Sequence, residues 1–217
     1  MLPHTVEIGS ADAVADALSF VPCRIPRPRT SDLGQPLTEW WMLRRLLQRY
    51  PDDLPFDFPL VIEKGERPDF LIKHNDMIYN LEATEATSHL DQHAWATTDR
   101  TKPHLVSEFG GRAEGGMGGN QPERLVIADV LRAIRRKRKL SRDLSPQCLN
   151  LLIYVNSEPG FLLDIEYFAA TVEGYWPLLD VSCKNYGDIF TILGKSCWLD
   201  IRGNKARIIR AIVSSPK

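Results

Sequence analysis

The sequence predicts an α/β protein, and three features of its 217 residues carry that prediction. Two long segments, 36–50 and 122–140, repeat apolar residues at helical spacing. Three short strand-like segments lie between them, and a continuous apolar segment follows the second helix. The resulting order is helix, strand, strand, strand, helix, strand, which is typical of a sheet flanked by helices.

Length and composition place the chain among globular proteins. Apolar residues make up 43% of it and charged residues 25%, which is enough apolar material for the core of one ordinary domain. We therefore expect a single domain over residues 1–217, in which residues 22–30, rich in Pro and Arg, form an extended connector. The formal net charge of -1 means that binding to a polyanion would have to use a local basic patch.

The sequence lacks the features of secreted and membrane proteins. Residues 1–10 show no basic segment followed by an apolar one, as a signal peptide would. No apolar run approaches the roughly 20 residues of a membrane span. Four cysteines form no CxxC pair, which indicates reduced core thiols: Cys23, Cys148, Cys183 and Cys197. We expect a soluble, cytoplasmic protein without a membrane partner.

The first predicted elements are two helices. Ser10 would cap a short helix over residues 11–18. In the longer helix, 36–50, an advance of about 100° per residue places Glu39 within the apolar face. Three apolar residues lie within about 40° of it: Leu43, Leu46 and Tyr50. A buried carboxylate without a partner is costly, so Glu39 belongs either to a functional site or to a salt bridge with an arginine.

Three strand-like segments follow, at 58–63, 69–74 and 77–84. The pair Asn75-Asp76 between the second and the third is typical of a hairpin turn. Strand alternation places Glu82 and Thr84 on one face of the third strand. A hairpin would bring Asp69, at the start of the second strand, close to Glu82.

The second half of the chain contains one further long helix and several strands. Residues 98–121 are rich in Gly and lack periodicity, which predicts a long mobile loop. Helix 122–140 has Pro in its first turn and an apolar stripe of Val126, Ile127, Val130, Leu131 and Ile134. Residues 148–155 predict a strand covered on both faces. The remaining predicted elements are a helix near 165–172 and strands near 189–193, 197–201 and 206–213.

The three acids Glu39, Asp69 and Glu82 would meet where the hairpin and the first long helix pack together. Converging carboxylates form an oxygen-rich site that suits Mg²⁺ or Mn²⁺. Such an ion lowers the pKa of a bound water and stabilises negative charge on a phosphodiester. The acids therefore predict a metal-dependent hydrolytic site.

The sequences Pro68-Asp69 and Glu82-Ala83-Thr84, preceded by the helical acid Glu39, resemble the PD-(D/E)xK nuclease superfamily. The resemblance covers residues 36–155. It implies a restriction-endonuclease-like core, with a mixed central sheet flanked by helices in the order αβββαβ. It also implies a Mg²⁺- or Mn²⁺-dependent nuclease in which Asp69 and Glu82 are catalytic metal ligands and Glu39 is an auxiliary ligand.

One position departs from that pattern. Thr84 stands where the superfamily has a lysine that positions or activates the attacking water. Some members move this lysine to the following helix, and Lys137 is then the predicted catalytic lysine, with Arg138 nearly as well placed. If neither side chain reaches the acids, the alternative is a catalytically degenerate nuclease-fold module that binds nucleic acid or a protein partner.

The end of helix 122–140 carries a dense run of basic residues. This run is either a solvated helix face or a patch that contacts the phosphates of a nucleic acid. Its predicted nucleic-acid-binding residues are Arg135, Arg136, Arg138 and Lys139. The resemblance favours DNA over RNA as the partner. It also leaves a homodimer open, because many nucleases cut both strands as dimers.

Two further motifs carry weaker indications. His89 and His93 have the i, i+4 spacing of a zinc pair, but a third ligand is not evident and solvated surface histidines are the favoured interpretation. The glycine-rich segment 110–119 does not follow a strand and lacks the Lys-Ser/Thr of a phosphate-binding P-loop.

Overall fold

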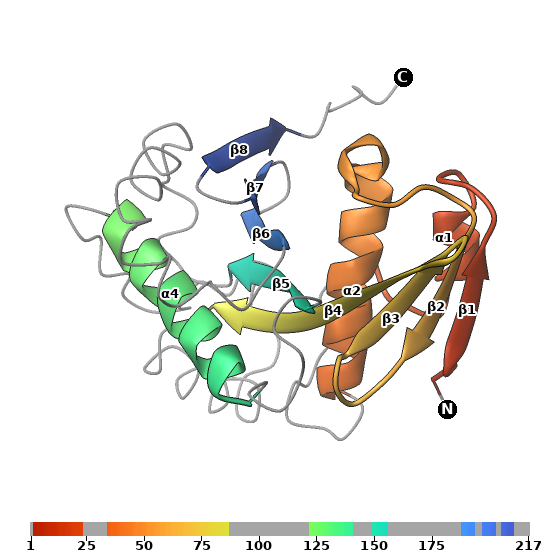
Figure 1. The fold of residues 1–217 in the computed structure, drawn as a ribbon, viewed down its shortest axis with the longest axis horizontal. Helices are drawn as coiled ribbons and strands as arrows, with labels where there is room; N and C mark the ends of the chain where they lie inside the picture. Colours follow the sequence, from red (N-terminus) through yellow and green to blue (C-terminus); the bar gives the residue numbers. More distant parts are fainter. Residues whose placement is uncertain are drawn as a thin grey trace.

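The described part of the chain forms one eight-stranded mixed sheet with helices packed against it (Figure 1). The computed structural model describes residues 2–23, 34–86, 122–140, 149–155, 188–193, 197–202 and 205–210. The helices are α1 (Val14–Ala17), α2 (Gly34–Arg49) and α4 (Pro122–Leu140), with the 3₁₀ helix η1 (Pro51–Asp53). The strands are β1 (Thr5–Ile8), β2 (Leu60–Lys64), β3 (Phe70–His74), β4 (Met77–Ala86), β5 (Leu149–Val155), β6 (Asp188–Leu193), β7 (Cys197–Arg202) and β8 (Lys205–Arg210). The predicted α/β class is confirmed.

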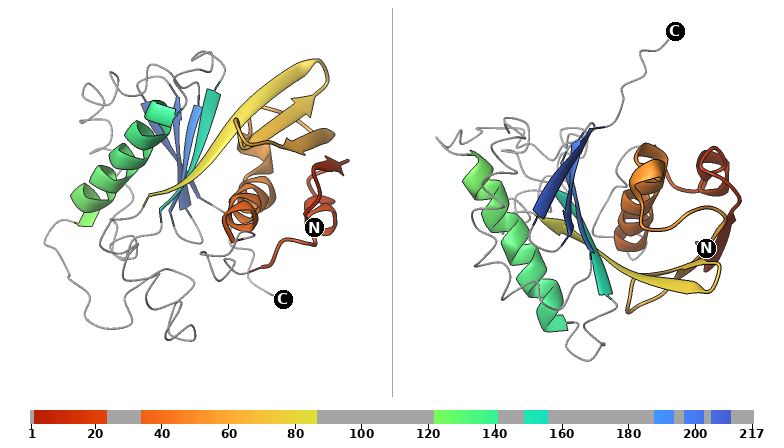
Figure 2. Two further views of the ribbon diagram at one scale, coloured as in Figure 1. Left: turned by 90° about the horizontal axis from the view of Figure 1, so that it is seen from below. Right: turned by 45° about the horizontal axis from the view of Figure 1, so that its top comes forward.

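The eight strands lie side by side in the order in which they occur along the chain. Strands β1 to β4 pair antiparallel, β5 pairs parallel with both β4 and β6, and β6 to β8 are again antiparallel. A parallel pair needs a crossover connection, and α4 lies in the chain between β4 and β5. Figure 2 shows α2 and α4 on opposite sides of the strands, so β4 and β5 lie between the two helices.

Helix α2 packs its apolar side against the sheet, as the sequence predicts. Leu43 and Leu46 are fully buried. Trp40 makes an edge-to-face contact with Phe70 of β3, with 5.0 Å between the ring centroids. The packing also buries Glu39, whose exposed fraction is 6%. The acid therefore lies in the apolar face where the helical period places it.

Strand β5 is covered on both faces, as its continuous apolar sequence predicts. Leu152 and Tyr154 belong to the core beneath α2, and alternation turns Leu151 and Ile153 toward α4. Helix α4 contributes four buried residues of its predicted stripe: Val126, Ile127, Val130 and Ile134. These apolar residues pack α4 against the sheet. Their packing determines which polar side chains of α4 can contact the strands.

The hairpin between β3 and β4 turns at Asn75 and Asp76, as predicted. Asn75 has a φ of 51°, a left-handed conformation that Asn tolerates better than most residues. The register pairs Phe70 with Leu81. The residue before Phe70 and the residue after Leu81 therefore come close together at the open end of the hairpin.

The N-terminal residues differ from the sequence analysis at one predicted helix and at one strand that was not predicted. The first helix begins later than predicted, with Ala13 rather than Ser10 at its N-cap, because the Ser10 carbonyl accepts the Ala13 N–H in a turn. Strand β1 was not predicted. Its four residues turn only Val6 and Ile8 inward, and so short an alternation does not distinguish a strand.

Several predicted features lie outside the described residues. They are most of the connector 22–30, the loop 98–121, the helix near 165–172, His89 and His93. The side chains of Arg138 and Lys139 also lie outside the described part, although their backbone belongs to α4. Among the cysteines, Cys23 is exposed and is not the core thiol that the sequence predicts.

Candidate active site

Asp69 stands where a tight loop leads into β3. The N–H of Gly65 donates to the Asp69 carbonyl at 2.9 Å. A β-carbon at Gly65 would lie 2.6 Å from the carbonyl oxygen of Pro68, so the loop has room only for glycine. Asp69 is buried, with an exposed fraction of 6%, and its Oδ2 accepts the backbone N–H of Ala83 at 2.8 Å. Both the loop and β4 therefore hold this carboxylate in place.

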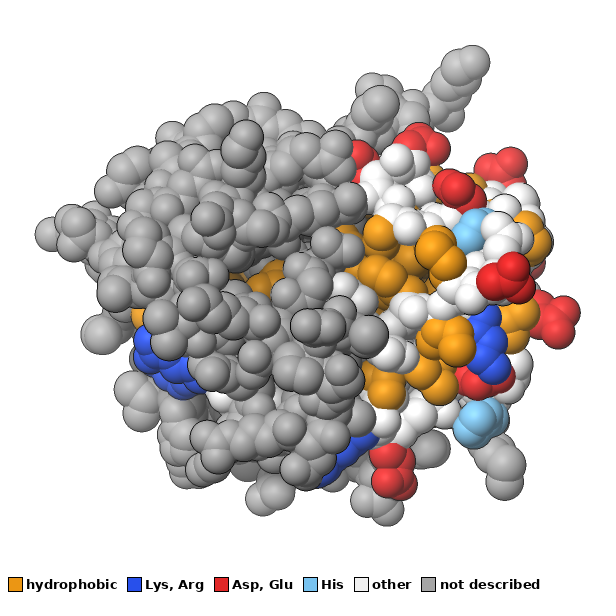
Figure 3. All heavy atoms as spheres, viewed as in Figure 1, with side chains coloured by type: hydrophobic (Ala, Val, Ile, Leu, Met, Phe, Trp, Pro, Cys, Tyr) orange, Lys and Arg blue, Asp and Glu red, His pale blue; other side chains and the backbone are white. Residues whose placement is uncertain are grey.

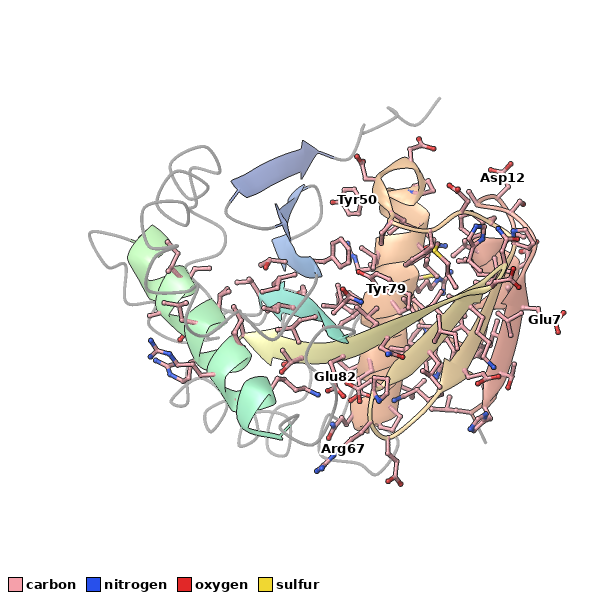
Figure 4. The ribbon with its side chains drawn as sticks, viewed as in Figure 1. Glu7, Asp12, Tyr50, Arg67, Tyr79 and Glu82 are labelled. Carbon is pink, nitrogen blue, oxygen red and sulfur yellow. The ribbon has the colours of Figure 1, made fainter. Side chains whose placement is uncertain are left out.

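Glu82 lies on β4, on the face that is turned toward α4 (Figure 4). Its neighbours Leu81 and Ala83 point the other way, into the core beneath α2. Glu82 is buried, with an exposed fraction of 4%. Two buried carboxylates close together are costly unless a cation compensates them.

Helix α4 supplies that cation. The Lys137 Nζ lies 2.6 Å from Glu82 Oε2 and 3.1 Å from Asp69 Oδ2. Ile134, one turn earlier, is buried against the sheet, so the next turn carries Lys137 toward β4. The structure thus brings together the three residues that the sequence analysis proposes as catalytic.

Burial and charge alter the protonation of these three groups. Burial raises the pKa of Glu82 above its usual 4.5, the charge of Asp69 raises it further, and Lys137 offsets only part of this. For Lys137, burial acts to lower the pKa, but the charges of Asp69 and Glu82 and the hydrogen bonds to them outweigh burial and raise it. The two acids therefore favour the ammonium form of the lysine.

A second lysine joins Glu39 to this site. The Lys64 Nζ lies 2.8 Å from Glu39 Oε2 and 3.8 Å from Asp69 Oδ1. The other oxygen of Glu39 accepts a hydrogen bond from Nε2 of Gln35 at 3.0 Å. Glu39 is therefore buried beside the site and ion-paired, but its partner is a lysine of β2 and not an arginine.

Lys64 was not predicted as a site residue, although the alternation of buried residues in β2 points to it. Leu60 and Ile62 are buried, and a period of two continues their face to Lys64. A lysine at the end of a strand is usually exposed. Lys64 therefore looks like an ordinary surface lysine, although it lies on the buried face of β2.

An arginine of α4 covers Thr84, the position where the resemblance leads us to expect lysine. Nη2 of Arg136 donates to Thr84 Oγ1 at 2.7 Å and to the Glu85 carbonyl at 3.0 Å. Thr84 is buried, whereas the Arg136 side chain is exposed. The guanidinium is therefore anchored beside the acids while part of it faces solvent.

The other predicted nucleic-acid-binding residues lie along the same helix. Arg135 is exposed on α4, and Arg132, one turn earlier, pairs with Asp129 at 2.6 Å. Figure 3 shows Lys and Arg side chains at the lower left, over α4, and most acidic side chains at the right, over other elements. Helix α4 therefore contributes basic side chains to this face.

Asp69 and Glu82 suit a hard divalent cation. Their buried oxygens converge on one point, where the Lys137 ammonium now binds both. Mg²⁺ is commonly held by one or two carboxylates together with waters and substrate phosphates, so two converging acids are a fitting donor set. In the described residues, no group of three or more His, Cys, Asp or Glu is placed to hold a metal. The three predicted ligands do not form one cluster, because Lys64 stands between Glu39 and Asp69.

Comparison of the chain with protein-family models, with curated proteins and with solved structures finds no match. None of the helices in the described residues is long and apolar enough to cross a membrane.

Proposed function

We propose that the chain is a metal-dependent nuclease of the PD-(D/E)xK type that hydrolyses a phosphodiester bond. The observation that carries the proposal is the contact of the Lys137 ammonium with both Asp69 and Glu82. Two acids and a lysine around one point are the groups that this superfamily uses. The lysine arrives from α4, although the motif position holds Thr84. The element order α2, β2, β3, β4, α4, β5 supports a restriction-endonuclease-like core.

In the proposed reaction a water oxygen attacks phosphorus, and the bond from phosphorus to the leaving sugar oxygen breaks. Mg²⁺ or Mn²⁺ held by Asp69 and Glu82 would supply a water of lowered pKa and neutralise charge on the phosphate. Lys137 donates hydrogen bonds to the attacking water or to the phosphate oxygens, where negative charge develops. The attacking water loses one proton to solvent, and the leaving oxygen takes up a proton from solvent.

The proposed substrate is DNA, in keeping with the resemblance, and the proposed binding surface is the basic side of α4. Arg135 is exposed there, and Arg136 is anchored next to the acids. Contacts of this kind with phosphates supply most of the affinity that does not depend on base sequence. A homodimer would let two such sites cut both strands.

A second function belongs to another class: a degenerate nuclease fold that binds nucleic acid or a protein partner without cleaving. The observation that favours it is Thr84 at the motif position. In that case the contacts of Lys137 with the two acids would form only a buried ion-pair network. Both functions allow binding to DNA, so only a cleavage assay separates them.

The test is nicking of a supercoiled plasmid by the full chain with Mg²⁺ or Mn²⁺, run beside a binding titration. We expect cleavage by the wild type, none by Asp69→Ala or Glu82→Ala, and binding that is largely kept in both variants. Glu63→Gln is the matched control, because Glu63 is a lysine-paired acid on β2 outside the site, 2.5 Å from Lys73. Binding without cleavage under every divalent ion would leave the degenerate module as the function.

A further inference from the structure

Lys64 ties together the three segments that meet behind Asp69. Its Nζ donates to the carbonyls of Gly65 at 3.0 Å and of Asp69 at 3.1 Å, both in the loop before β3. It also pairs with Glu39 of α2 at 2.8 Å and approaches Asp69 Oδ1 at 3.8 Å. One ammonium group therefore connects α2, the end of β2 and the start of β3.

Asp69 divides its two oxygens between the lysines. Oδ2 faces Lys137 at 3.1 Å, on the side of Glu82, and also accepts the N–H of Ala83. Oδ1 faces Lys64. Oδ2 therefore lies on the side of Glu82, and Oδ1 lies on the side of Lys64 and Glu39.

The two lysines differ in how they are anchored. Lys64 holds two backbone carbonyls in addition to its acids, whereas the described contacts of the Lys137 Nζ are with Asp69 and Glu82 alone. A cation that enters between Asp69 and Glu82 can replace the ammonium of Lys137. Replacing Lys64 as well would break both carbonyl contacts and leave a half-buried ammonium without its anions, which is costly.

We propose that Glu39 and Lys64 are a positioning pair and not part of a second metal site. Both oxygens of Glu39 are occupied, Oε1 by Gln35 and Oε2 by Lys64. Glu39 holds Lys64. Lys64 binds the backbone carbonyl of Asp69 and places its positive charge 3.8 Å from Oδ1, so that Oδ2 is left to face Glu82. The centre then takes its protein ligands from Asp69 and Glu82 alone and binds one ion. This inference rests on the proposed metal-dependent function.

The test is a titration of the metal-free full chain with Mn²⁺, in which the spectrum of unbound Mn²⁺ gives the number of bound ions and their Kd without any substrate. The wild type should bind one ion. Glu39→Gln should also bind one, because an amide oxygen still accepts a hydrogen bond from Lys64. Asp69→Asn should bind none.

Lys64→Met should weaken Mn²⁺ binding about tenfold or more, the size of effect known for residues that orient a metal ligand. Lys64→Arg, which keeps the cation, should recover part of the affinity. Lys73→Met is the matched control, because Lys73 pairs with Glu63 on the same hairpin outside the site and its loss should leave the Kd unchanged. Thermal melting of each variant checks that it is folded.

If the wild type binds two ions and Glu39→Gln binds one, Glu39 is a metal ligand. That result would overturn the positioning role but not the proposed function. Affinity in a folded Lys64→Met equal to that of the wild type would overturn the positioning role as well. If Lys64→Met does not fold, the ion counts of the wild type and of Glu39→Gln still decide. An absence of Mn²⁺ binding in the wild type would overturn the proposed function together with this inference.

Discussion

Asp69 is the residue at which the described contacts of the site converge. Its carboxylate meets one backbone N–H and two ammonium groups, from Ala83, Lys137 and Lys64. These partners come from β4, α4 and β2, so the position of the carboxylate reports the packing of all three elements. Each buried acid of the site is paired with a lysine: Glu39 with Lys64, and Asp69 and Glu82 with Lys137.

The two neighbouring arginines of α4 should differ in their effect on cleavage. Arg136→Ala removes a guanidinium anchored at Thr84, so we expect weaker DNA binding, a salt slope smaller by about 1, and slower cleavage at saturating DNA. Arg135→Ala removes an exposed charge and should weaken binding alone. Salt titrations and single-turnover rates measure both. Equal rates at saturation in the two variants would show that Arg136 serves only in binding.

The raised pKa of Glu82 predicts how stability depends on pH in the metal-free protein. Between the two pKa values the folded chain keeps a proton on Glu82 that the unfolded chain has lost. The contribution of Glu82 to the free energy of unfolding is therefore fully present below pH 4.5 and is lost as pH rises through the pKa of the folded state. Lys137 does not titrate in this window, because its pKa is raised from 10.5. Urea unfolding of wild type and Glu82→Gln at a series of pH values, with a chelator present, measures it. A pH-independent difference between the two proteins would contradict the prediction.

At the scale of elements, the sequence predicts best where a period runs long. The bounds of α4 are predicted correctly, because its apolar stripe extends over several turns. Alternation in β4 likewise identifies the face of Glu82 and Thr84. The four residues of β1 give no such run, since that strand is defined by pairing with β2, a contact between distant parts of the chain.

In the site, too, local patterns predict some positions, and contacts between distant elements are not predicted. Glu39, Asp69 and Glu82 could be placed near one another from helical period, hairpin register and alternation. The reach of Lys137 depends on how α4 crosses the sheet, and the resemblance rather than the period supplied that expectation. The period of β2 places Lys64 on the buried face of that strand, but its pairing with Glu39 joins two elements whose packing no local pattern encodes.

The loop between β2 and β3 should be intolerant of a side chain at Gly65. A β-carbon there would meet a backbone oxygen at 2.6 Å, and overpacking of this kind costs about 1–3 kcal/mol of unfolding free energy. Because the loop carries Asp69, Gly65→Ala should also weaken Mn²⁺ binding. Gly9→Ala is the control, since nothing lies within 4 Å of a β-carbon at Gly9. Denaturant unfolding and the Mn²⁺ titration measure both effects, and equal behaviour of the two variants would contradict this account of the loop.

At the scale of the whole molecule, the site lies where the sheet changes from antiparallel to parallel pairing. Strand β4 pairs with β3 up to Leu81 and with β5 from Asn80 onward, so Glu82 is the first residue of β4 beyond the β3 ladder. Helices α2 and α4 approach β4 from opposite sides (Figure 2). Each brings one member of the charge network, Glu39 from α2 and Lys137 from α4. The fold therefore assembles on β4 a group of charges that no single element contains.

We propose that Lys137 supplies from α4 the cation that Thr84 does not, and a cleavage rate tests this role. The measurement is the single-turnover rate of plasmid nicking at saturating DNA and Mg²⁺, for the wild type and for Lys137→Ala, with Arg135→Ala as a helix-surface control. We predict that the wild type and the control cleave and that Lys137→Ala is slower by about 10²-fold or more, the usual loss when one donor to developing negative charge is removed. A wild type that does not cleave, or a Lys137→Ala variant that cleaves as fast as the wild type, would contradict the claim.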